Sequence, residues 1–106
     1  MSGKRSRTKG HSFERWAAIK FRSVFPKACR HLEYQEGDAN GVDLKNTGDY
    51  RVQCKAYKDY APINKIREIK ESGIPVLLTK GDNKTPMAVI PFEHFLHLLS
   101  KVHVED

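Results

Sequence analysis

Apolar residues recur at helical spacing near both ends of the chain. In residues 12–25 (SFERWAAIKFRSVF) they follow the spacing of a helix with one buried face. Ser12 is a suitable N-cap and Pro26 a suitable stop, so the pattern predicts a helix over this range. Residues 91–101 repeat the spacing and predict a last helix.

Between these helices the pattern changes to short segments separated by turn residues. Residues 74–81 are almost continuously apolar, as in a strand buried on both faces, and apolar and polar side chains alternate in residues 50–57. We expect, in chain order, a helix at 12–25, strands at 28–34, 41–46 and 50–57, a helix at 62–72, strands at 74–81 and in MAVIPF, and a helix at 91–101. This order, αβββαββα, predicts an α/β fold with a mixed central sheet of about five strands flanked by helices.

The length of 106 residues suffices for one domain and is too short for two. We expect a basic flexible tail at residues 1–10 and a single domain at residues 11–106. With 39% hydrophobic and 30% charged residues, the composition is that of a soluble globular protein. The first residues lack the apolar stretch of a secretion signal, so we expect a cytoplasmic location.

The formal net charge of +6 is unevenly distributed. Residues 1–30 contain nine basic side chains and one acid, Glu14, whereas the rest of the chain is slightly acidic. A basic region on a near-neutral body is typical of proteins that bind a polyanion, because each neutralised phosphate releases counterions. We therefore expect a nucleic acid as the partner and no membrane; a solvated basic tail is the alternative.

The cysteines and histidines do not form a recognisable metal motif. Cys29 and Cys54 are too few and too far apart for a zinc site, and we expect both to be buried, reduced thiols. His94 and His97 lie three residues apart in the last predicted helix, beside large apolar residues. We expect them to pack or to face solvent.

The predicted hairpin at 41–57 brings polar residues of different chemistry together. Its strands are joined by Thr47, Gly48 and Asp49, a favourable turn combination. A reversal centred on Gly48 places Asp43 opposite Gln53, with Lys55 on the same face as Gln53. A carboxylate, an amide oxygen and an ammonium group would then share one patch, which in a generic hairpin could be a surface network.

Four segments together resemble the PD-(D/E)xK nuclease superfamily: KGHSFER, EGDANGVDL, YRVQCKAY and IPVLLTK. Archaeal-type Holliday-junction resolvases are similar in the KGxxFER opening, and Mrr-type restriction nucleases are similar in GDANGVDL followed by VQCK. The resemblance implies a restriction-endonuclease-like fold and a DNA endonuclease that depends on Mg²⁺, with Mn²⁺ as a substitute. Such an enzyme hydrolyses phosphodiester bonds.

The same resemblance implies roles for individual residues. Asp43 would bind the metal directly, together with the Gln53 side-chain oxygen and the main-chain carbonyl of Cys54, and Glu14 would complete the site through water or a second metal. Lys55 would hold the attacking water or the scissile phosphate. Gln53 stands where many relatives have Glu, which removes one negative charge and leaves open a catalytically degenerate DNA-binding module.

DNA would be held mainly by basic residues near the N-terminus. The candidate contacts are Arg5, Arg7, Lys9, Arg15, Arg22, Lys58 and Tyr60. No recognition-helix motif is present, so we expect selection by the shape of a branched duplex. The expected function is a Holliday-junction resolvase of recombination and repair, nucleoid-associated or phage-encoded, and acting as a homodimer because a junction needs two symmetric nicks. A Mrr-like or phage-type nuclease acting on other DNA forms is the alternative.

Overall fold

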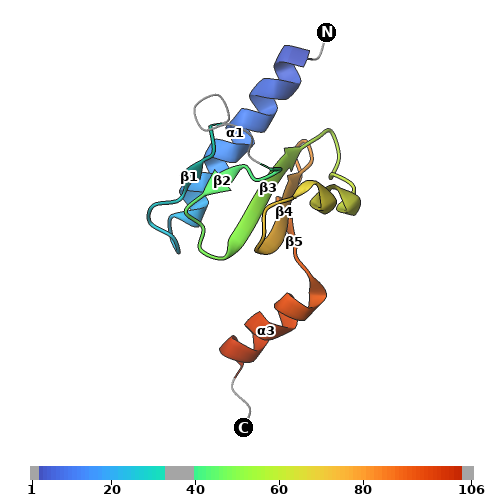
Figure 1. Cartoon of the computed structure of the whole chain (residues 1–106). Coiled ribbons are helices and arrows are strands. Elements are labelled where there is room, and N and C mark those ends of the chain that lie inside the picture. The colour runs from blue at the N-terminus through green and yellow to red at the C-terminus, as the bar shows by residue number, and fades with distance from the viewer. Residues whose placement is uncertain (1–2, 33–39, 104–106) are drawn as a thin grey trace.

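The structure, a computed structural model, describes residues 3–32 and 40–103, and side chains from residue 8 onward. Helix α1 (Gly3–Phe21) and helix α3 (Phe92–Val102) enclose the other elements in sequence, and Figure 1 shows them at opposite ends of the molecule. Between them lie β1 (Cys29–Arg30), β2 (Leu44–Lys45), β3 (Tyr50–Ala56), the 3-10 helix η1 (Ile63–Glu68), β4 (Ile74–Lys80) and β5 (Met87–Val89). The chain therefore has an α/β fold, with its helices and strands in the predicted order.

The strands form two sheets, so the single sheet of about five strands that we expected was wrong. In the larger sheet β4 is central, β3 runs parallel to it from Tyr50↔Ile74 to Ala56↔Lys80, and β5 is antiparallel on the other edge. The smaller sheet is the antiparallel pair β1–β2. No ladder joins β1 or β2 to β3, and the backbone bond from Asp43 N to Val52 O (2.8 Å) links the two sheets.

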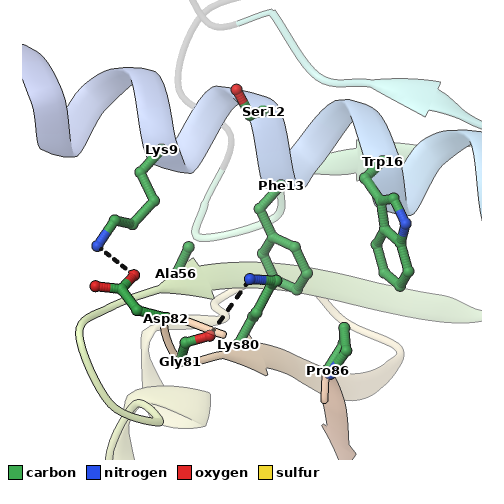
Figure 2. A pocket seen from close by; sticks show the side chains of 9 residues that line it. All are labelled: Lys9, Ser12, Phe13, Trp16, Ala56, Lys80, Gly81, Asp82 and Pro86. Atoms are coloured by element: carbon green, nitrogen blue, oxygen red, sulfur yellow. Dashed lines mark hydrogen bonds and ion pairs between the residues drawn. The ribbon is translucent and has the colours of Figure 1, made fainter. Parts of the chain in front are cut away.

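Helix α1 begins at Gly3 rather than at Ser12, so residues 3–10 extend the helix instead of forming a separate tail. Lysine and arginine are good helix formers, and an ion pair from Lys9 to Asp82 (2.8 Å) holds this part of α1 to the turn after β4 (Figure 2). The helix ends at Phe21, before the predicted residue 25. Arg22 Nε then donates to the carbonyl of Ala28 (2.9 Å) and closes the turn that follows.

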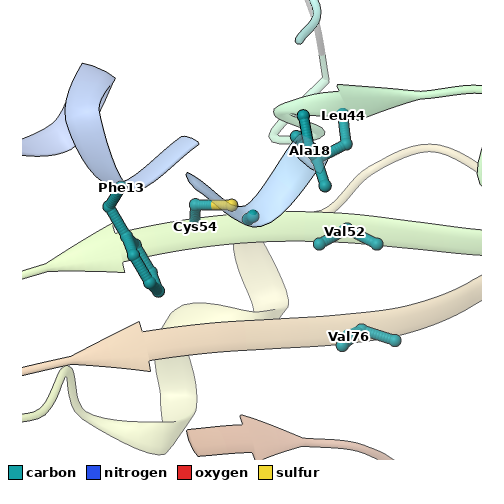
Figure 3. Close-up of a cluster of buried hydrophobic side chains, with 7 residues drawn as sticks. Phe13, Ala18, Leu44, Val52, Cys54 and Val76 are labelled. Carbon is teal, nitrogen blue, oxygen red and sulfur yellow. The ribbon is translucent and has the colours of Figure 1, made fainter. Parts of the chain in front are cut away.

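The core lies between α1 and the sheet. Phe13, Ala17 and Ala18 of α1 pack against Val52 and Cys54 of β3, with Leu44 and Val76 beside them (Figure 3). The two alanines let the helix backbone approach β3 closely, and Ala17 and Val52 have no exposed surface. The predicted inward face of residues 50–57 is thus confirmed for Val52 and Cys54.

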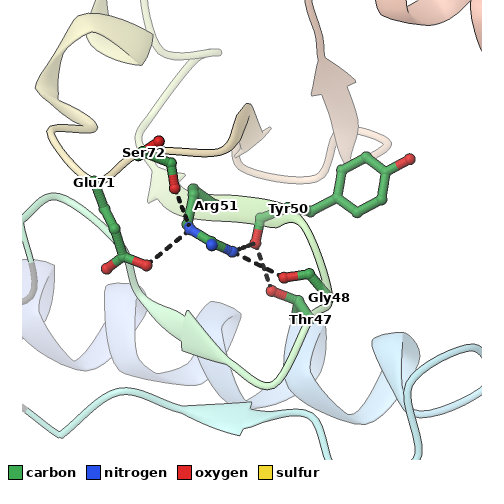
Figure 4. Close-up of polar contacts among 6 residues, drawn as sticks. All are labelled: Thr47, Gly48, Tyr50, Arg51, Glu71 and Ser72. Carbon is green, nitrogen blue, oxygen red and sulfur yellow. Dashed lines mark hydrogen bonds and ion pairs between the residues drawn. The ribbon is translucent and has the colours of Figure 1, made fainter.

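Arg51 connects the turn before β3 to the segment before β4. Its guanidinium donates to the carbonyls of Gly48 (2.9 Å) and Ser72 (2.7 Å) and pairs with Glu71 (2.8 Å), as Figure 4 shows. The Thr47 hydroxyl donates to the carbonyl of Tyr50 (2.7 Å) within the same turn. These contacts fix where the parallel strands β3 and β4 start.

The connection between β3 and β4 contains a short 3-10 helix where a longer helix at 62–72 was expected. Pro62 precedes η1, and the backbone is again extended at Ile69, which ends the helix after Glu68. Across the ranges described, no helix is both long and apolar enough to cross a membrane.

Candidate functional site

Asp43 lies at the junction of the two sheets and is held by its main chain and its side chain. Its N–H donates to Val52 O and its carbonyl accepts from His31 N, both at 2.8 Å. Its carboxylate Oδ2 accepts the N–H of Cys54 at 2.8 Å. The sequence placed Asp43 opposite Gln53, and the structure brings its carboxylate to the peptide that joins Gln53 to Cys54.

The main chain of Cys54 faces the same edge of β3 as Asp43. The N–H and C=O of one residue point to the same side of a strand, and the Cys54 N–H points to Asp43. The Cys54 carbonyl is therefore directed toward the edge where the Asp43 carboxylate lies. This orientation suits the main-chain ligand that the family resemblance implies.

Gln53 and Lys55 lie on the face of β3 opposite the α1 core. The Gln53 side chain is buried, and its Nε2 donates to Glu68 Oε1 at 2.9 Å. Lys55 Nζ contacts the same carboxylate oxygen at 3.0 Å. The structure thus joins the two predicted residues through a third, at the end of η1.

Glu68 was not predicted from the sequence. Its segment, INKIRE, resembles an ordinary polar turn of helix, and its partners are 13 and 15 residues away in the chain. Hydrogen bonds from Lys55 and Lys65 lower the pKa of Glu68, and the bond to Glu68 raises the pKa of Lys65. Glu68 could have been found only by knowing that β3 and β4 are parallel. That pairing carries the connecting segment, which includes Glu68, across the face of β3 that bears Gln53 and Lys55.

Glu14, on α1, pairs with Arg30 of β1 at 3.1 Å. Glu14 and Asp43 both act electrostatically on Cys54. Burial raises the pKa of the Cys54 thiol well above its usual range, and the negative charges of Asp43 and Glu14 raise it further. The two carboxylates therefore lie near one buried thiol at the junction of α1, β1 and β3.

Carboxylate, amide and main-chain oxygens are the ligand types that suit a hard divalent cation such as Mg²⁺, which binds few protein ligands and keeps several waters. Gln53 Oε1 is buried, and no donor among the described residues reaches it. A buried oxygen without a donor is suited to a cation. Within those residues no three His, Cys, Asp or Glu side chains form a metal cluster, so a metal bound here would also need amide or main-chain oxygens. Glu36 and Asp38, which precede Asp43 in the sequence and are further candidate acids for a metal, lie outside the described residues.

Of the predicted DNA-binding residues whose side chains are described, Arg15 and Arg22 lie together and Lys9 lies apart. Arg15 and Arg22 line a cavity of about 420 Å³ together with Arg30, which makes a cationic groove beside Glu14. Lys9 lies elsewhere, paired with Asp82, and the side chains of Arg5 and Arg7 are not described.

The segment after β3 supplies the two remaining candidates. Lys58 is exposed, and the Tyr60 hydroxyl donates to the carbonyl of Thr85 at 2.7 Å. The Tyr60 hydroxyl is therefore engaged in a hydrogen bond within the protein.

Comparison of the chain with known protein families, with curated proteins and with solved structures finds no match. The site is therefore defined by three features of the molecule itself. They are the carboxylate of Asp43 at the edge of β3, the Gln53–Glu68–Lys55 cluster on its outer face, and the cationic groove along α1.

Proposed function

We propose that the chain is a phosphodiesterase of the PD-(D/E)xK class, with a restriction-endonuclease-like core, that uses a divalent metal ion to cleave DNA. The observation that carries this proposal is the position of Asp43, whose carboxylate binds the Gln53–Cys54 peptide of the strand that also presents Lys55. The cationic groove of Arg15, Arg22 and Arg30 adds a surface for phosphates.

Within that class, the particular function we propose is resolution of four-way DNA junctions by a homodimer. The KGHSFER opening supports it, and a chain with one site needs a two-fold partner to make paired nicks. A nuclease core of this kind would select a junction by its shape.

Asp43, Gln53 Oε1, the Cys54 carbonyl and Glu14 would hold Mg²⁺. When bound, the ion would make water nucleophilic at neutral pH and neutralise charge on the phosphoryl group. Lys55 would place its ammonium on a phosphate oxygen or the attacking water, and Glu68 orients Lys55 through the 3.0 Å ion pair. Attack of water on phosphorus with loss of the 3′ oxygen would leave a 5′ phosphate and a 3′ hydroxyl.

Glu68 supports an active enzyme over a degenerate one. Gln53 lacks the charge that Glu carries in many relatives, and the Glu68 carboxylate lies 2.9 Å from the Gln53 amide nitrogen. The same hydrogen bond turns Gln53 Oε1 away from Glu68 and leaves this oxygen for another ligand.

A 5′-labelled four-way junction incubated with Mg²⁺ or Mn²⁺, beside a linear duplex, tests the proposal. We expect symmetric paired nicks in the junction with the wild type, and loss of roughly 10²–10³-fold in rate for Asp43→Ala and Lys55→Ala. Lys84→Ala is the control, since Lys84 is exposed and contacts Asp59 at 3.7 Å, away from the site.

Each other outcome has a definite meaning. Cutting of every duplex would favour a Mrr-like or phage-type nuclease, and metal-independent binding without product would favour a degenerate DNA-binding module. Equal cleavage by Asp43→Ala and the wild type would disprove the assigned site.

A further inference from the structure

An apolar groove runs along α1 on the side away from the cationic groove. It consists of two cavities, of about 380 and 200 Å³, that share Trp16 and Pro86 as lining residues. Phe13 and Trp16 form one wall, as Figure 2 shows for the larger cavity, and Leu78 and Met87 contribute to the opposite wall. Trp16 is 42% exposed and Met87 52% exposed, so the groove lies open to solvent.

Helix α3 has an apolar stripe that nothing in the described chain covers. No residue of α3 is buried. The stripe follows helical spacing and consists of Phe92, Phe95, Leu96, Leu99 and Val102, each 37% or more exposed. An exposed stripe of this kind marks an interaction surface.

The stripe and the groove match in length as well as in chemistry. On α1 the groove extends from Lys9 to Phe21, about 18 Å at 1.5 Å per residue. Helix α3 has 11 residues and is about 16 Å long. The groove is also lined by charged residues of both signs, namely Lys9, Lys20, Lys80 and Asp82, and α3 likewise carries Glu93 in its first turn and Lys101 in its last. A helix with one apolar face is the expected ligand of such a groove.

The chain directs its own α3 away from this groove. Two residues, Ile90 and Pro91, separate β5 from α3, and Pro91 is extended (φ −58°, ψ 137°). The first turn of α3 is then held to the start of β3 by the Tyr50 hydroxyl and His94 Nε2, 2.7 Å apart. Figure 1 shows the rest of α3 leaving the body of the molecule, and the radius of gyration, 14.5 Å, exceeds the roughly 13 Å expected for a compact chain of this length.

We propose that the groove binds α3 of a second copy of this chain, and that two copies exchange these helices around a two-fold axis. Each copy then supplies one helix and one groove, which closes the assembly as a dimer. The inference gives the homodimer of the proposed function its contact surface. The residues of the groove and of the stripe do not include Asp43 or Lys55. A test of dimerisation can therefore fail while a test of cleavage succeeds, and the reverse.

Sedimentation of the full chain over a range of concentrations tests the proposal. We expect a wild-type dimer, and a monomer for both Leu99→Asp in the stripe and Met87→Glu in the groove. Ser100→Asp is the matched control: it adds the same charge one position away, where Ser100 is exposed outside the stripe, and it should still dimerise. Circular dichroism of each variant checks that it is folded.

Mixing the two monomeric variants gives the sharper result. Leu99→Asp keeps an intact groove and Met87→Glu keeps an intact α3, so one of the two contacts can form in a mixed dimer. Association in the mixture, absent from either variant alone, supports exchange. A wild type that stays monomeric, or a Met87→Glu variant that dimerises like the wild type, would overturn it.

Trp16, the only tryptophan in the sequence, gives a second measurement. Its emission should shift to shorter wavelength as the wild type dimerises and the groove is covered, and Leu99→Asp should show no such shift. Asp43→Ala should dimerise normally even if it cuts nothing, which separates failure of the dimer from failure of the catalytic proposal.

Discussion

Glu68 determines how two side chains of β3 are presented. One of its carboxylate oxygens accepts from Gln53 Nε2 and contacts Lys55 Nζ, and the other contacts Lys65 Nζ at 3.2 Å. A single acid thus fixes the direction of the Gln53 amide and the position of the Lys55 ammonium. In the proposed enzyme Glu68 is a positioning residue, because it acts through Gln53 and Lys55.

Replacing Glu68 with Gln should lower metal-dependent cleavage by roughly 10–100-fold, the usual cost of losing a group that orients a metal ligand. Mn²⁺ binding, measured by calorimetry, should weaken in parallel. The free energy of unfolding should change by less than about 1 kcal/mol, because the ion pairs of Glu68 are exposed. Glu71→Gln is the control, since Glu71 pairs with Arg51.

The same contacts give a pH dependence. Because the pKa of Glu68 is lowered in the folded chain, its ion pairs stabilise the fold above the ordinary carboxyl pKa of about 4.3. This stabilisation is lost as the pH falls through the lowered value.

Cleavage and metal binding that are unchanged in Glu68→Gln would show that Glu68 does not position the site.

At the scale of elements, the loop before Asp43 packs directly on η1. Gly41 has a φ of +79°, and a Cβ there would overlap the main-chain carbonyl of Glu68. Lys70 N also donates to Asn40 O at 2.8 Å. The loop that carries Asp43 and the helix that ends at Glu68 therefore depend on each other's position.

Two glycine substitutions test this close approach. Gly41→Ala should reduce the free energy of unfolding by roughly 1–3 kcal/mol, because the left-handed backbone and the overlap both disfavour a side chain. Gly10→Ala should instead increase it by about 0.5–1 kcal/mol, because Gly10 lies in α1 with open space around it. Denaturant unfolding of both variants measures the contrast, and a Gly41→Ala variant as stable as the wild type would disprove the tight contact.

The sequence predicted elements better than it predicted their partners. Val52 and Cys54 share the apolar face of the alternation in residues 50–57 and both lie in the core, because successive side chains of a strand point to opposite faces. The alternation did not show that Gln53, on the polar face, is buried as well. It could not show that Leu44 and Lys45 pair with β1 rather than with β3, since pairing depends on distant backbone. Glu68 was missed for the same reason: its partners come together only through the crossover between parallel strands.

At the scale of the whole molecule, positive charge gathers along one side of α1. Arg15, Arg22 and Arg30 line one cavity, and the Arg15 side chain is exposed. Arg15 and Arg22 are seven residues apart, which places them on one side of a helix. The sequence could not predict the separate orientation of Lys9, which follows from the ion pair with Asp82.

Removing one of these charges should change how DNA binding responds to salt. Arg15→Gln should weaken binding to all DNA sequences and reduce the slope of log K against log salt by about 0.9, the contribution of one phosphate contact. Fluorescence anisotropy at several salt concentrations measures the slope. Lys84→Gln, which removes an exposed charge paired with Asp59, is the control, and equal slopes for the two variants would exclude the groove as the DNA contact.

The parallel pairing of β3 with β4 also sets the order in which the chain can become functional during synthesis. Residues Glu14, Asp43, Gln53, Lys55 and Glu68 all precede Ile74, the first residue of β4. Chains emerge from the ribosome N-terminus first, and parallel strands pair only after the connecting segment has closed. A nascent chain that ends before Ile74 therefore contains every residue of the proposed site without the strand that holds Gln53 and Lys55 in place. Termination before Ile74 would therefore leave the proposed site unformed, and in the proposed enzyme a growing chain would cleave DNA only after β4 has been made.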